Sequence, residues 1–436
     1  MSEQMRGPVA FTIMAVLLVI VGIFQSWNVS LSILNLCLIS AIMALGVNIQ
    51  WGYAGLFNVG VMGFAALGGV AAVIISMPPV TEAVAAGGTG IFLGLLLGAL
   101  TVALAVTLYR ILPPGWARTV GVAAAIIIGY SVTRRVFLPA AEVVEAIDPA
   151  STGYLGGFGL PIVLAWPIGG ALAGLAAWVV GKITLGLRSD YLAIATLGIS
   201  EIIVAVLKHE DWLARGVKNV NGLPRPGPVP YEIELQQAEW FLDFSMRLGA
   251  DPVTFSSIYV KLSYALLFLT VLLIVLWLSE RALKSPWGRM MRAIRDNEVS
   301  ANAMGKDVTA RHLQVFILGS IVVGIAGAML TTLDGQLTPS SYQPLRFTFL
   351  IWVMVIVGGS GNNWGAVFGG FVIWFFWVQA EPIGLWLMDT ITAGMPEDSS
   401  LRDHLLDSAA QMRLMTMGLI LLLVLRFSPR GVIPER

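Results

Sequence analysis

The feature that most constrains this chain is a series of long apolar stretches that recurs from one end to the other. A transmembrane helix needs about 20 predominantly apolar residues. Hydrophobic residues make up 57% of the chain and charged residues only 12%, about half of their share in a soluble domain. We therefore expect an all-α, polytopic integral membrane protein, one domain over 1–436 with about 10–12 transmembrane helices and some broken or re-entrant segments. The stretches run over about 9–27, 31–49, 57–77, 91–112, 119–138, 162–183, 190–208, 259–280, 312–332, 346–357, 364–380 and 412–427.

The distribution of charge predicts which segments lie on which side of the membrane. Lys and Arg concentrate in cytoplasmic loops, so the basic interruption at 281–311 is expected to be cytoplasmic. Alternating the stretches from a cytoplasmic N-terminus then places the C-terminus on the same side. The acid-rich segments 209–258 and 381–411 fall on the other side and are expected to be periplasmic.

The loop 281–311 contains one predicted amphipathic helix at 285–305. Ser285 can accept hydrogen bonds from the first free N–H groups, Pro286 suits the first helical position, and Gly305 can end the helix. Its apolar side chains recur at helical spacing, so this face needs a cover. A soluble partner, the lipid headgroup layer or the protein's own helix ends could supply it. The apolar face consists of Trp287, Met290, Met291, Ile294 and Ala301.

Two glycine-rich breaks interrupt the apolar pattern, QWGYAGLFN at Gln50–Asn58 and GGSGNNW at Gly358–Trp364. Lipid cannot satisfy the backbone of a non-helical segment, so at membrane depth such a segment must be buried in protein or line a cavity. Both breaks are therefore candidates for a translocation pathway, although each could instead be an ordinary turn between helices at the cytoplasmic surface. The candidate polar residues of such a pathway are Asn48, Tyr53, Asn58, Thr196, Asn362 and Asn363.

One acidic residue, Glu201, lies inside the stretch 190–208. It follows Asp190 by eleven residues, which at 1.5 Å per residue puts it roughly 16 Å into the bilayer. A carboxylate at that depth costs several kcal/mol unless it is paired or protonated, so Glu201 is a further candidate pathway residue. A structural hydrogen bond to a neighbouring helix is the alternative. Gly198, one turn earlier, would let another helix approach the same face.

The sequence also indicates which activities to exclude. The net formal charge is zero, which gives no electrostatic reason to expect a nucleic-acid partner. The P-loop pattern G-x-x-x-x-G-K-[ST] does not occur, and three histidines with the single Cys37 show no metal-binding spacing. We expect no enzyme, no catalytic residues, no metal site and no cofactor in this chain.

The residues of the loop also match a known pattern. The segment Ser285–Gly288–Arg289–Ala293–Ile294–Arg295–Asp296–Asn297–Glu298, followed by Gly305–Lys306–Asp307–Val308, resembles the cytoplasmic loop of permease subunits of branched-chain amino acid ABC importers. Three further stretches, Ala44–Gly69, Leu187–Pro226 and Val322–Gly370, resemble the same family in the same order. Within the second stretch, Trp212, Gly216 and Asn221–Gly222–Leu223–Pro224 resemble a turn of one of the two permease types.

The resemblance implies a type II-like importer permease, multi-pass in a bacterial inner membrane. Its partners would be a second homologous permease, two ATPase subunits carrying ATP and Mg²⁺, and a periplasmic binding protein that delivers a branched-chain or related amino acid. Relatives that carry urea or short-chain amides leave the substrate as a class. The loop would be the coupling helix that seats in a groove of the ATPase. The coupling residues expected on this basis are Ser285, Trp287, Gly288, Arg289, Arg292, Ile294, Arg295, Asp296, Glu298 and Gly305.

Two regions depart from the family pattern. Asn58–Val59–Gly60–Val61 stands where members commonly have serine, leucine, glycine and histidine, which removes any inference about substrate at that position. The region 80–160 is expected to be an inserted helical hairpin of the stretches 91–112 and 119–138. Arg134 and Arg135 then fall outside, so the second stretch is either misassigned or a short re-entrant piece.

A different class of transporter remains as an alternative. In an ion-coupled secondary transporter, Glu201 would be the coupling carboxylate and the helix at 285–305 only a connector. Such carriers often contain repeats with matched broken helices, which the two glycine-rich breaks resemble.

Overall fold

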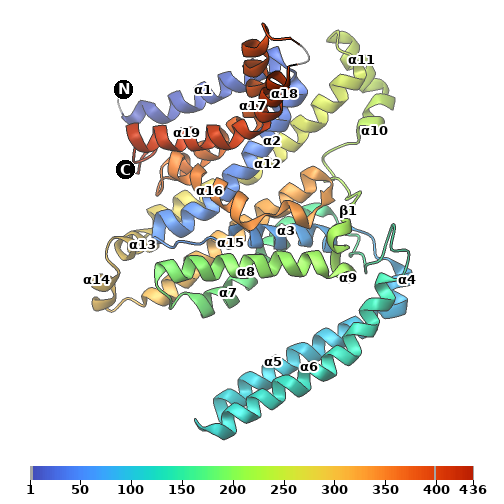
Figure 1. The fold of residues 1–436 in the computed structure, drawn as a ribbon, viewed down its shortest axis with the longest axis vertical. Coiled ribbons are helices and arrows are strands. Elements are labelled where there is room, and N and C mark those ends of the chain that lie inside the picture. The colour runs from blue at the N-terminus through green and yellow to red at the C-terminus, as the bar shows by residue number, and fades with distance from the viewer. Residues whose placement is uncertain (1–2, 397–398, 436) are drawn as a thin grey trace.

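The computed structural model describes residues 3–396 and 399–435, and helices make up nearly all of its regular structure (Figure 1). Two strands of two residues each, β1 and β2, pair antiparallel. In chain order the elements are α1 (Glu3–Phe24), α2 (Trp27–Val47), η1 (Asn48–Gly52), α3 (Val61–Ser76), α4 (Thr81–Ala83), η2 (Val84–Gly88), α5 (Thr89–Ile111), α6 (Trp116–Glu145), η3 (Ile162–Leu164), α7 (Ala165–Thr184), α8 (Ser189–His209), α9 (Asp211–Ala214), η4 (Gly216–Lys218), β1 (Val220–Asn221), α10 (Glu232–Gln237), α11 (Glu239–Arg247), α12 (Pro252–Lys284), α13 (Pro286–Asp296), α14 (Glu298–Ala303), α15 (Val308–Asp334), β2 (Gln336–Leu337), η5 (Pro339–Ser341), α16 (Pro344–Gly358), α17 (Asn363–Thr392), α18 (Ser400–Asp407), η6 (Ser408–Gln411) and α19 (Met412–Phe427).

Each predicted apolar stretch corresponds to a helix. In the described part of the chain, ten helices are long and apolar enough to cross a membrane, and two more apolar helices, α3 and α16, are shorter. The predicted all-α polytopic fold is therefore confirmed. Several boundaries differ. Residues 57–60 of the stretch 57–77 lie outside any helix, so α3 begins only at Val61, and α17 continues to Thr392, beyond the predicted end at 380.

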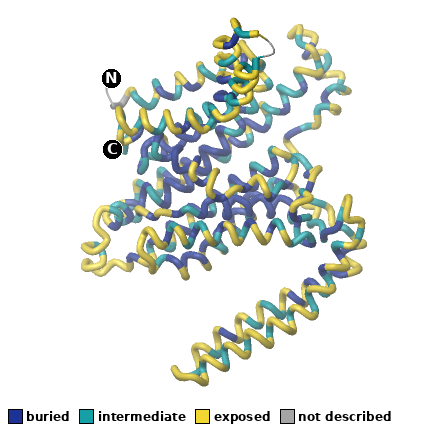
Figure 2. Tube along the Cα trace, in the orientation of Figure 1, coloured by how far each residue is buried: buried dark blue, intermediate teal, exposed yellow. Residues whose placement is uncertain are grey.

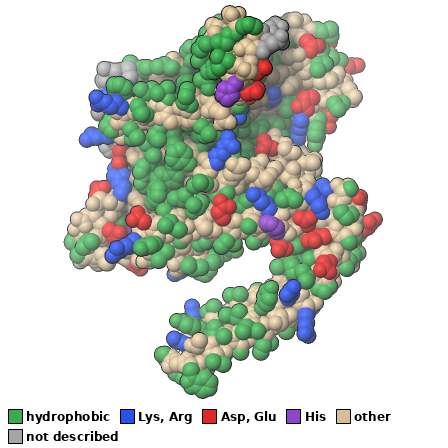
Figure 3. Space-filling model, viewed as in Figure 1, with side chains coloured by type: hydrophobic (Ala, Val, Ile, Leu, Met, Phe, Trp, Pro, Cys, Tyr) green, Lys and Arg blue, Asp and Glu red, His purple; other side chains and the backbone are tan. Residues whose placement is uncertain are grey.

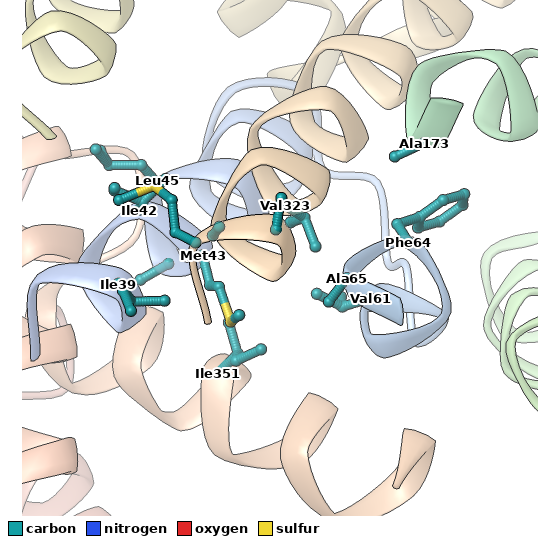
Figure 4. Packing of buried hydrophobic residues seen from close by; sticks show 14 of the residues in the cluster. Ile39, Ile42, Met43, Leu45, Val61, Phe64, Ala65, Ala173, Val323 and Ile351 are labelled. Carbon is teal, nitrogen blue, oxygen red and sulfur yellow. The ribbon is translucent and has the colours of Figure 1, made fainter. Parts of the chain in front are cut away.

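The core lies where α2, α3, α7, α15 and α16 meet. Figure 4 shows Ile42 and Leu45 of α2, Phe64 of α3 and Val323 of α15 in this region, and all four are buried. Figure 2 shows the same concentration of buried residues in the central helices and exposed residues along the outer helices. Many of these exposed residues are large and apolar. An apolar exterior is what a lipid environment requires.

Glycine allows α15 to pack directly against α3 and α7. A Cβ atom built on Gly327 would collide with the carbonyl oxygen of Ala65, and one on Gly68 would collide with that of Gly324. Close approach of backbones at small residues is the usual way in which membrane helices pack. Backbones also approach closely at the start of α17, because a Cβ atom on Gly365 would lie 2.8 Å from the carbonyl oxygen of Gly358.

The helices α5 and α6 form a hairpin that projects away from the body of the protein (Figure 1). Gly94 of α5 packs against Phe137 of α6, and Gly129 packs against Thr101. The alternative of a short re-entrant piece at 119–138 is wrong. α6 is one helix of 30 residues, about 45 Å long, which passes through Arg134 and Arg135 and ends at Glu145. The predicted stretch 119–138 already contained these two arginines, and the helix continues seven residues beyond it.

The two ends of the helical bundle differ in which elements and which charged side chains lie there. Both termini lie at the end that also holds α13 and α14, whereas α9, α10, α11 and α18 lie at the opposite end (Figure 1). Figure 3 shows Asp and Glu side chains gathered toward that opposite end. This arrangement is the one expected from the charge pattern, in which 281–311 and both termini share one side.

Candidate functional site

The segment that matched the coupling loop folds as two helices, not as the single helix predicted for 285–305. α13 ends at Asp296, and the side chain of Asn297 accepts a hydrogen bond from the backbone N–H of Ser300, which starts α14. An asparagine is among the strongest residues at the start of a helix, and this local signal was missed. Gly305, at φ +77°, lies beyond the end of α14.

α13 begins as the sequence predicted. The hydroxyl of Ser285 accepts a hydrogen bond from the N–H of Gly288 at 3.3 Å, and Pro286 occupies the first helical position. Its apolar face turns inward, and Met291 and Ile294 are fully buried. The protein's own helix ends therefore supply the cover. Ile294, expected as a contact for a partner, instead holds α13 against the bundle.

Arg295 connects α13 to two distant parts of the chain. Its guanidinium lies 2.9 Å from the carboxylate of Glu435 in the C-terminal tail and donates a hydrogen bond to the carbonyl oxygen of Gly52 at the end of η1. A second contact runs from the indole N–H of Trp287 to the side-chain oxygen of Gln314 in α15, at 3.3 Å. α13 is therefore fixed to α15, to η1 and to the tail.

The two glycine-rich breaks lie against each other. The first break, Gln50–Asn58, overlaps the π-helical turn η1 (Asn48–Gly52). The backbone N–H of Gly361 in the second break donates to the side-chain oxygen of Asn48 in η1 at 2.8 Å. π-helical turns occur often at functional sites. The second break is a tight turn between α16 and α17, and Asn362 accepts hydrogen bonds from the N–H groups of Trp364 and Gly365. Each break was interpreted either as part of a translocation pathway or as an ordinary turn between helices. The second break fits the turn between helices.

Asn363 is the centre of a buried polar network beneath these breaks. Its side-chain oxygen accepts hydrogen bonds from Asn48, at 3.1 Å, and from the hydroxyl of Tyr53. Its amide group donates to Glu280 at the end of α12, at 3.0 Å. Asn48, Tyr53 and Asn363 are fully buried, so these three pathway candidates are packed inside the protein.

A second network surrounds the non-helical residues before α3. Asn58 donates to Gln50 at 2.9 Å, and Gln50 donates to the backbone of Phe316 and to Ser320 in α15. Thr196 of α8 accepts a hydrogen bond from the N–H of Val59 at 3.1 Å. The candidates Asn58 and Thr196 thus join α8 to the first break.

Glu201 lies in the middle of α8, as expected, but its side chain points away from the rest of the chain. Residue 201 is exposed, and its carboxylate makes no hydrogen bond or ion pair within 3–396 and 399–435. The alternative of a structural hydrogen bond to a neighbouring helix of this chain is therefore wrong. Gly198 faces the same way, and a Cβ atom built on it would meet nothing within 4 Å.

Two grooves adjoin α13 at the end of the bundle that carries the termini. The first, of about 770 Å³, combines four arginines with two acids. The second, of about 720 Å³, runs between the start of α1, the end of α12 and the tail, and it shares Arg292 and Glu435 with the first. The charged residues of the first groove are Arg289, Arg292, Arg295, Asp296, Arg430 and Glu435.

Several residues of this region were not identified from the sequence. Glu280 and Gln50 take part in the buried networks, and the tail covers the second break through hydrogen bonds from Val432 to Val357 and from Ile433 to Gly358, both at 2.9 Å. An acid at the end of an apolar stretch, as at Glu280, was an available signal. No cluster of three or more potential metal ligands occurs in the part of the chain that the structure describes.

Comparison with known families decides the class of protein. The sequence model described as "Branched-chain amino acid transport system / permease component" matches residues 95–425. The chain belongs to this permease family. The match begins inside α5 and ends inside α19. It therefore includes α13 and Asn363 but not the first break.

Relatives with curated names agree with this assignment. The chain is 27% identical over 179 residues to the probable branched-chain amino acid transport permease protein LivM of Methanocaldococcus jannaschii, which covers 40% of this chain and 47% of that protein. It is 25% identical over 225 residues to the high-affinity branched-chain amino acid transport system permease protein LivM of Escherichia coli, covering 50% of each. The chain thus spans about half the length of these relatives. No solved structure matches it.

A third relative limits what the family says about substrate. The fructose import permease protein FrcC of Rhizobium meliloti is 25% identical over 132 residues, covering 29% of this chain and 35% of that protein. Permeases named for an amino acid and for a sugar therefore share this sequence pattern. The family assignment establishes a multi-pass transport permease.

Proposed function

We propose that this chain is one of two membrane-spanning permease subunits of an ATP-driven importer for branched-chain or related amino acids. ATPase subunits that bind ATP and Mg²⁺ drive the import, and a periplasmic binding protein delivers the substrate. The assignment rests on the family match over 95–425 and on the names of its relatives. On this proposal α13, α14 and both termini face the cytoplasm.

The single observation that carries the mechanism is the position of Arg295. A displacement of α13 would act at once on the carbonyl oxygen of Gly52 and on Glu435 in the tail that covers the second break. Both breaks then join the Asn363 network, which reaches α12 through Glu280. Movement of an ATPase against α13 thus has a short route of contacts into the bundle.

The surface offered to an ATPase is the exposed side of α13 and α14. Arg289, Asp296 and Glu298 are exposed there, and Arg292 is half-buried. Ser285, Trp287 and Gly288 shape the start of α13, where a Cβ atom on Gly288 would collide with the carbonyl oxygen of Leu283. Gly305 ends the segment in a conformation that favours glycine.

The pathway proposed for substrate is bordered by Asn58, Thr196 and Glu201 on one side of the protein. Asn48, Tyr53, Asn362 and Asn363 hold the breaks in place from inside the protein, and they would open a path only if the two breaks separate. In this proposal, ATP-driven movement of α13 separates the two breaks.

The test is ATP-dependent amino acid uptake in cells that co-express this chain with a second permease, the ATPase subunits and the binding protein. Arg289→Glu, on the exposed side of α13, should abolish ATPase co-purification and uptake. Arg295→Gln should reduce uptake while leaving ATPase co-purification intact. Arg110→Glu, at the exposed end of α5 on the same side, is the matched control and should change neither.

Two results would count against this proposal. Unchanged ATPase co-purification and uptake in Arg289→Glu and Arg295→Gln would remove the coupling role of α13. Uptake without ATPase subunits, driven by a proton or sodium gradient and lost in Glu201→Gln, would instead establish the ion-coupled carrier.

A further inference from the structure

The outward face of α8 is chemically unsuited to lipid. Its exposed residues recur at helical spacing and are apolar or small except for Glu201, which lies twelve residues beyond Ser189 and thus about 18 Å into the helix. A carboxylate facing hydrocarbon at that depth costs at least several kcal/mol, so something other than lipid must cover it. The face, called here the Glu201 face, consists of Tyr191, Ile194, Gly198, Glu201, Ile202, Ala205 and Val206.

A second observation places another surface that lipid cannot solvate directly beside α8. Residues 55–60 are non-helical, and Gly55 and Phe57 are exposed. The segment joins α8 through the hydrogen bond from Val59 to Thr196. Within the described residues, no hydrogen-bond acceptor is found for the backbone N–H groups of Phe57 and Asn58. Exposed non-helical backbone is tolerated in a membrane only against protein or water.

The shape of the Glu201 face favours another helix. Gly198 lies almost one turn before Glu201 and Ala205 one turn after it, and the space above Gly198 is open. Small residues on either side of a polar residue let a second backbone approach closely enough to hydrogen-bond with it. The covering element is therefore a transmembrane helix that carries a hydrogen-bond donor or a cation at the depth of Glu201.

The charge also argues against a second copy of this chain as the cover. A two-fold pair would bring the same face of each subunit together, which places Glu201 near its own copy. Two carboxylates at close range in a low dielectric repel each other, and no cation on the Glu201 face would offset this repulsion. The complementary surface belongs to a chain of different sequence.

We propose that the Glu201 face is the contact surface for a second, non-identical permease subunit, which places a hydrogen-bond donor or a cationic side chain against Glu201. The inference rests on the proposed function, in which such a subunit takes part, and it specifies which surface meets it and why the pair is not symmetric. The carboxylate thus selects the partner, because a wrong partner would leave it unpaired.

The test compares two glycines that both have open space for a side chain. Gly198→Leu places a bulky group on the Glu201 face, and Gly418→Leu places the same group on the exposed side of α19. Both variants should insert and melt like the wild type when this chain is purified alone. Co-purification of the co-expressed second permease should fall about tenfold or more for Gly198→Leu and stay within twofold for Gly418→Leu.

Substitution of the acid tests the chemistry of the contact. Glu201→Gln keeps a hydrogen-bond acceptor and should retain most of the second permease, whereas Glu201→Lys should lose it about tenfold or more. Cysteines at Ile202 and Ala205 should form disulfides with single cysteines on a helix of the second permease. A cysteine at Leu273, on the exposed side of α12, should form none. The native Cys37 is fully buried and can stay in place.

Three results would overturn the inference. The first is normal co-purification of the second permease with the Gly198→Leu and Glu201→Lys variants. The second is formation of disulfides between two copies of this chain and not with the second permease. The third is that a membrane-impermeant thiol reagent labels a Glu201→Cys variant equally with and without the second permease. Uptake is measured separately. A pair that forms through this face but takes up no branched-chain amino acid would reject the proposed substrate alone, whereas uptake unaffected by Gly198→Leu would reject the interface alone.

Discussion

The guanidinium of Arg295 in α13 lies 2.9 Å from the carboxylate of Glu435 in the C-terminal tail, 140 residues further along the chain. The same side chain donates a hydrogen bond to Gly52, 243 residues before it. One arginine therefore joins the segment proposed to meet the ATPase to both breaks in the membrane helices. The proposed coupling route therefore also includes the C-terminal tail.

Separate substitutions should distinguish the two contacts of Arg295. Glu435→Gln removes the ion pair but leaves the bond to Gly52, and we expect uptake to fall about two- to threefold because a partly exposed pair contributes about 1 kcal/mol or less. Arg295→Gln removes the ion pair and alters the contact with Gly52, and uptake should fall further. The measurement is initial uptake rate at matched membrane levels. A larger loss in Glu435→Gln than in Arg295→Gln would show that the Gly52 contact contributes nothing.

The Asn363 network should make a measurable contribution to stability. Asn363→Ala leaves Tyr53, Asn48 and Glu280 without their shared partner, and an unsatisfied buried polar group costs about 1–3 kcal/mol. We expect a fall of several degrees in the melting temperature of the purified protein in detergent.

Two further variants calibrate that result. Tyr53→Phe removes only one donor and should cost less, because Asn363 still accepts from Asn48. Asn302→Ala, on the exposed side of α14, should leave the melting temperature unchanged. Equal melting temperatures for Asn363→Ala and Asn302→Ala would mean that the network contributes nothing to stability.

The helices were predictable because their lengths and composition follow from the thickness of a bilayer. The same holds for the start of α13, since Ser285 and Pro286 act on neighbouring backbone groups. The break at Asn297 depended on an equally local signal, and it was missed because the apolar spacing continues to Ala301. Local chemistry therefore accounts for most of what the sequence predicted correctly and for one of its errors.

The arrangement of the site depended on contacts that sequence spacing does not encode. Asn48 and Gly361 are 313 residues apart, yet they are joined by a hydrogen bond that brings the two breaks together. Helical periodicity placed Gly198 and Glu201 on one face, but only the packing of α3, α7 and α16 against α8 determines that this face points outward. The sequence thus predicted candidate residues but not which of them are covered.

Close helix packing predicts that Gly327→Ala is strongly destabilising. The new methyl group would collide with the backbone of Ala65 in α3. Because α3 is part of the closely packed core, its backbone can move away only by disturbing that core. Overpacking of this kind costs about 1–3 kcal/mol or more, so we expect little correctly inserted protein. Gly418→Ala, where a Cβ atom would meet nothing within 4 Å, should express and melt like the wild type. Normal expression of Gly327→Ala would show that α3 and α15 do not pack at this distance.

A final prediction concerns acid sensitivity at the end of the bundle that carries α10. Burial alone would raise the pKa of Glu232, but the hydrogen bond and charge of Arg225, 2.7 Å away, outweigh this and lower the pKa below its usual range. A carboxylate whose pKa is lowered on folding stabilises the fold above its unfolded pKa of about 4.3. That stabilisation is lost as the pH falls through the lower pKa of the folded state.

Limited proteolysis of the segment 209–258 between pH 7 and pH 3 measures this effect. Cleavage in the wild type should increase as the pH approaches and passes below 4, because protonated Glu232 no longer pairs with Arg225. Glu232→Gln should already be more easily cleaved at pH 7 and should show a weaker dependence on pH. Glu239→Gln, an exposed position on α11, is the matched control and should follow the wild type. If Glu232→Gln kept the full pH dependence, the acid sensitivity would have to arise from another carboxylate of the segment, and the ion pair with Arg225 would not hold α10 in place.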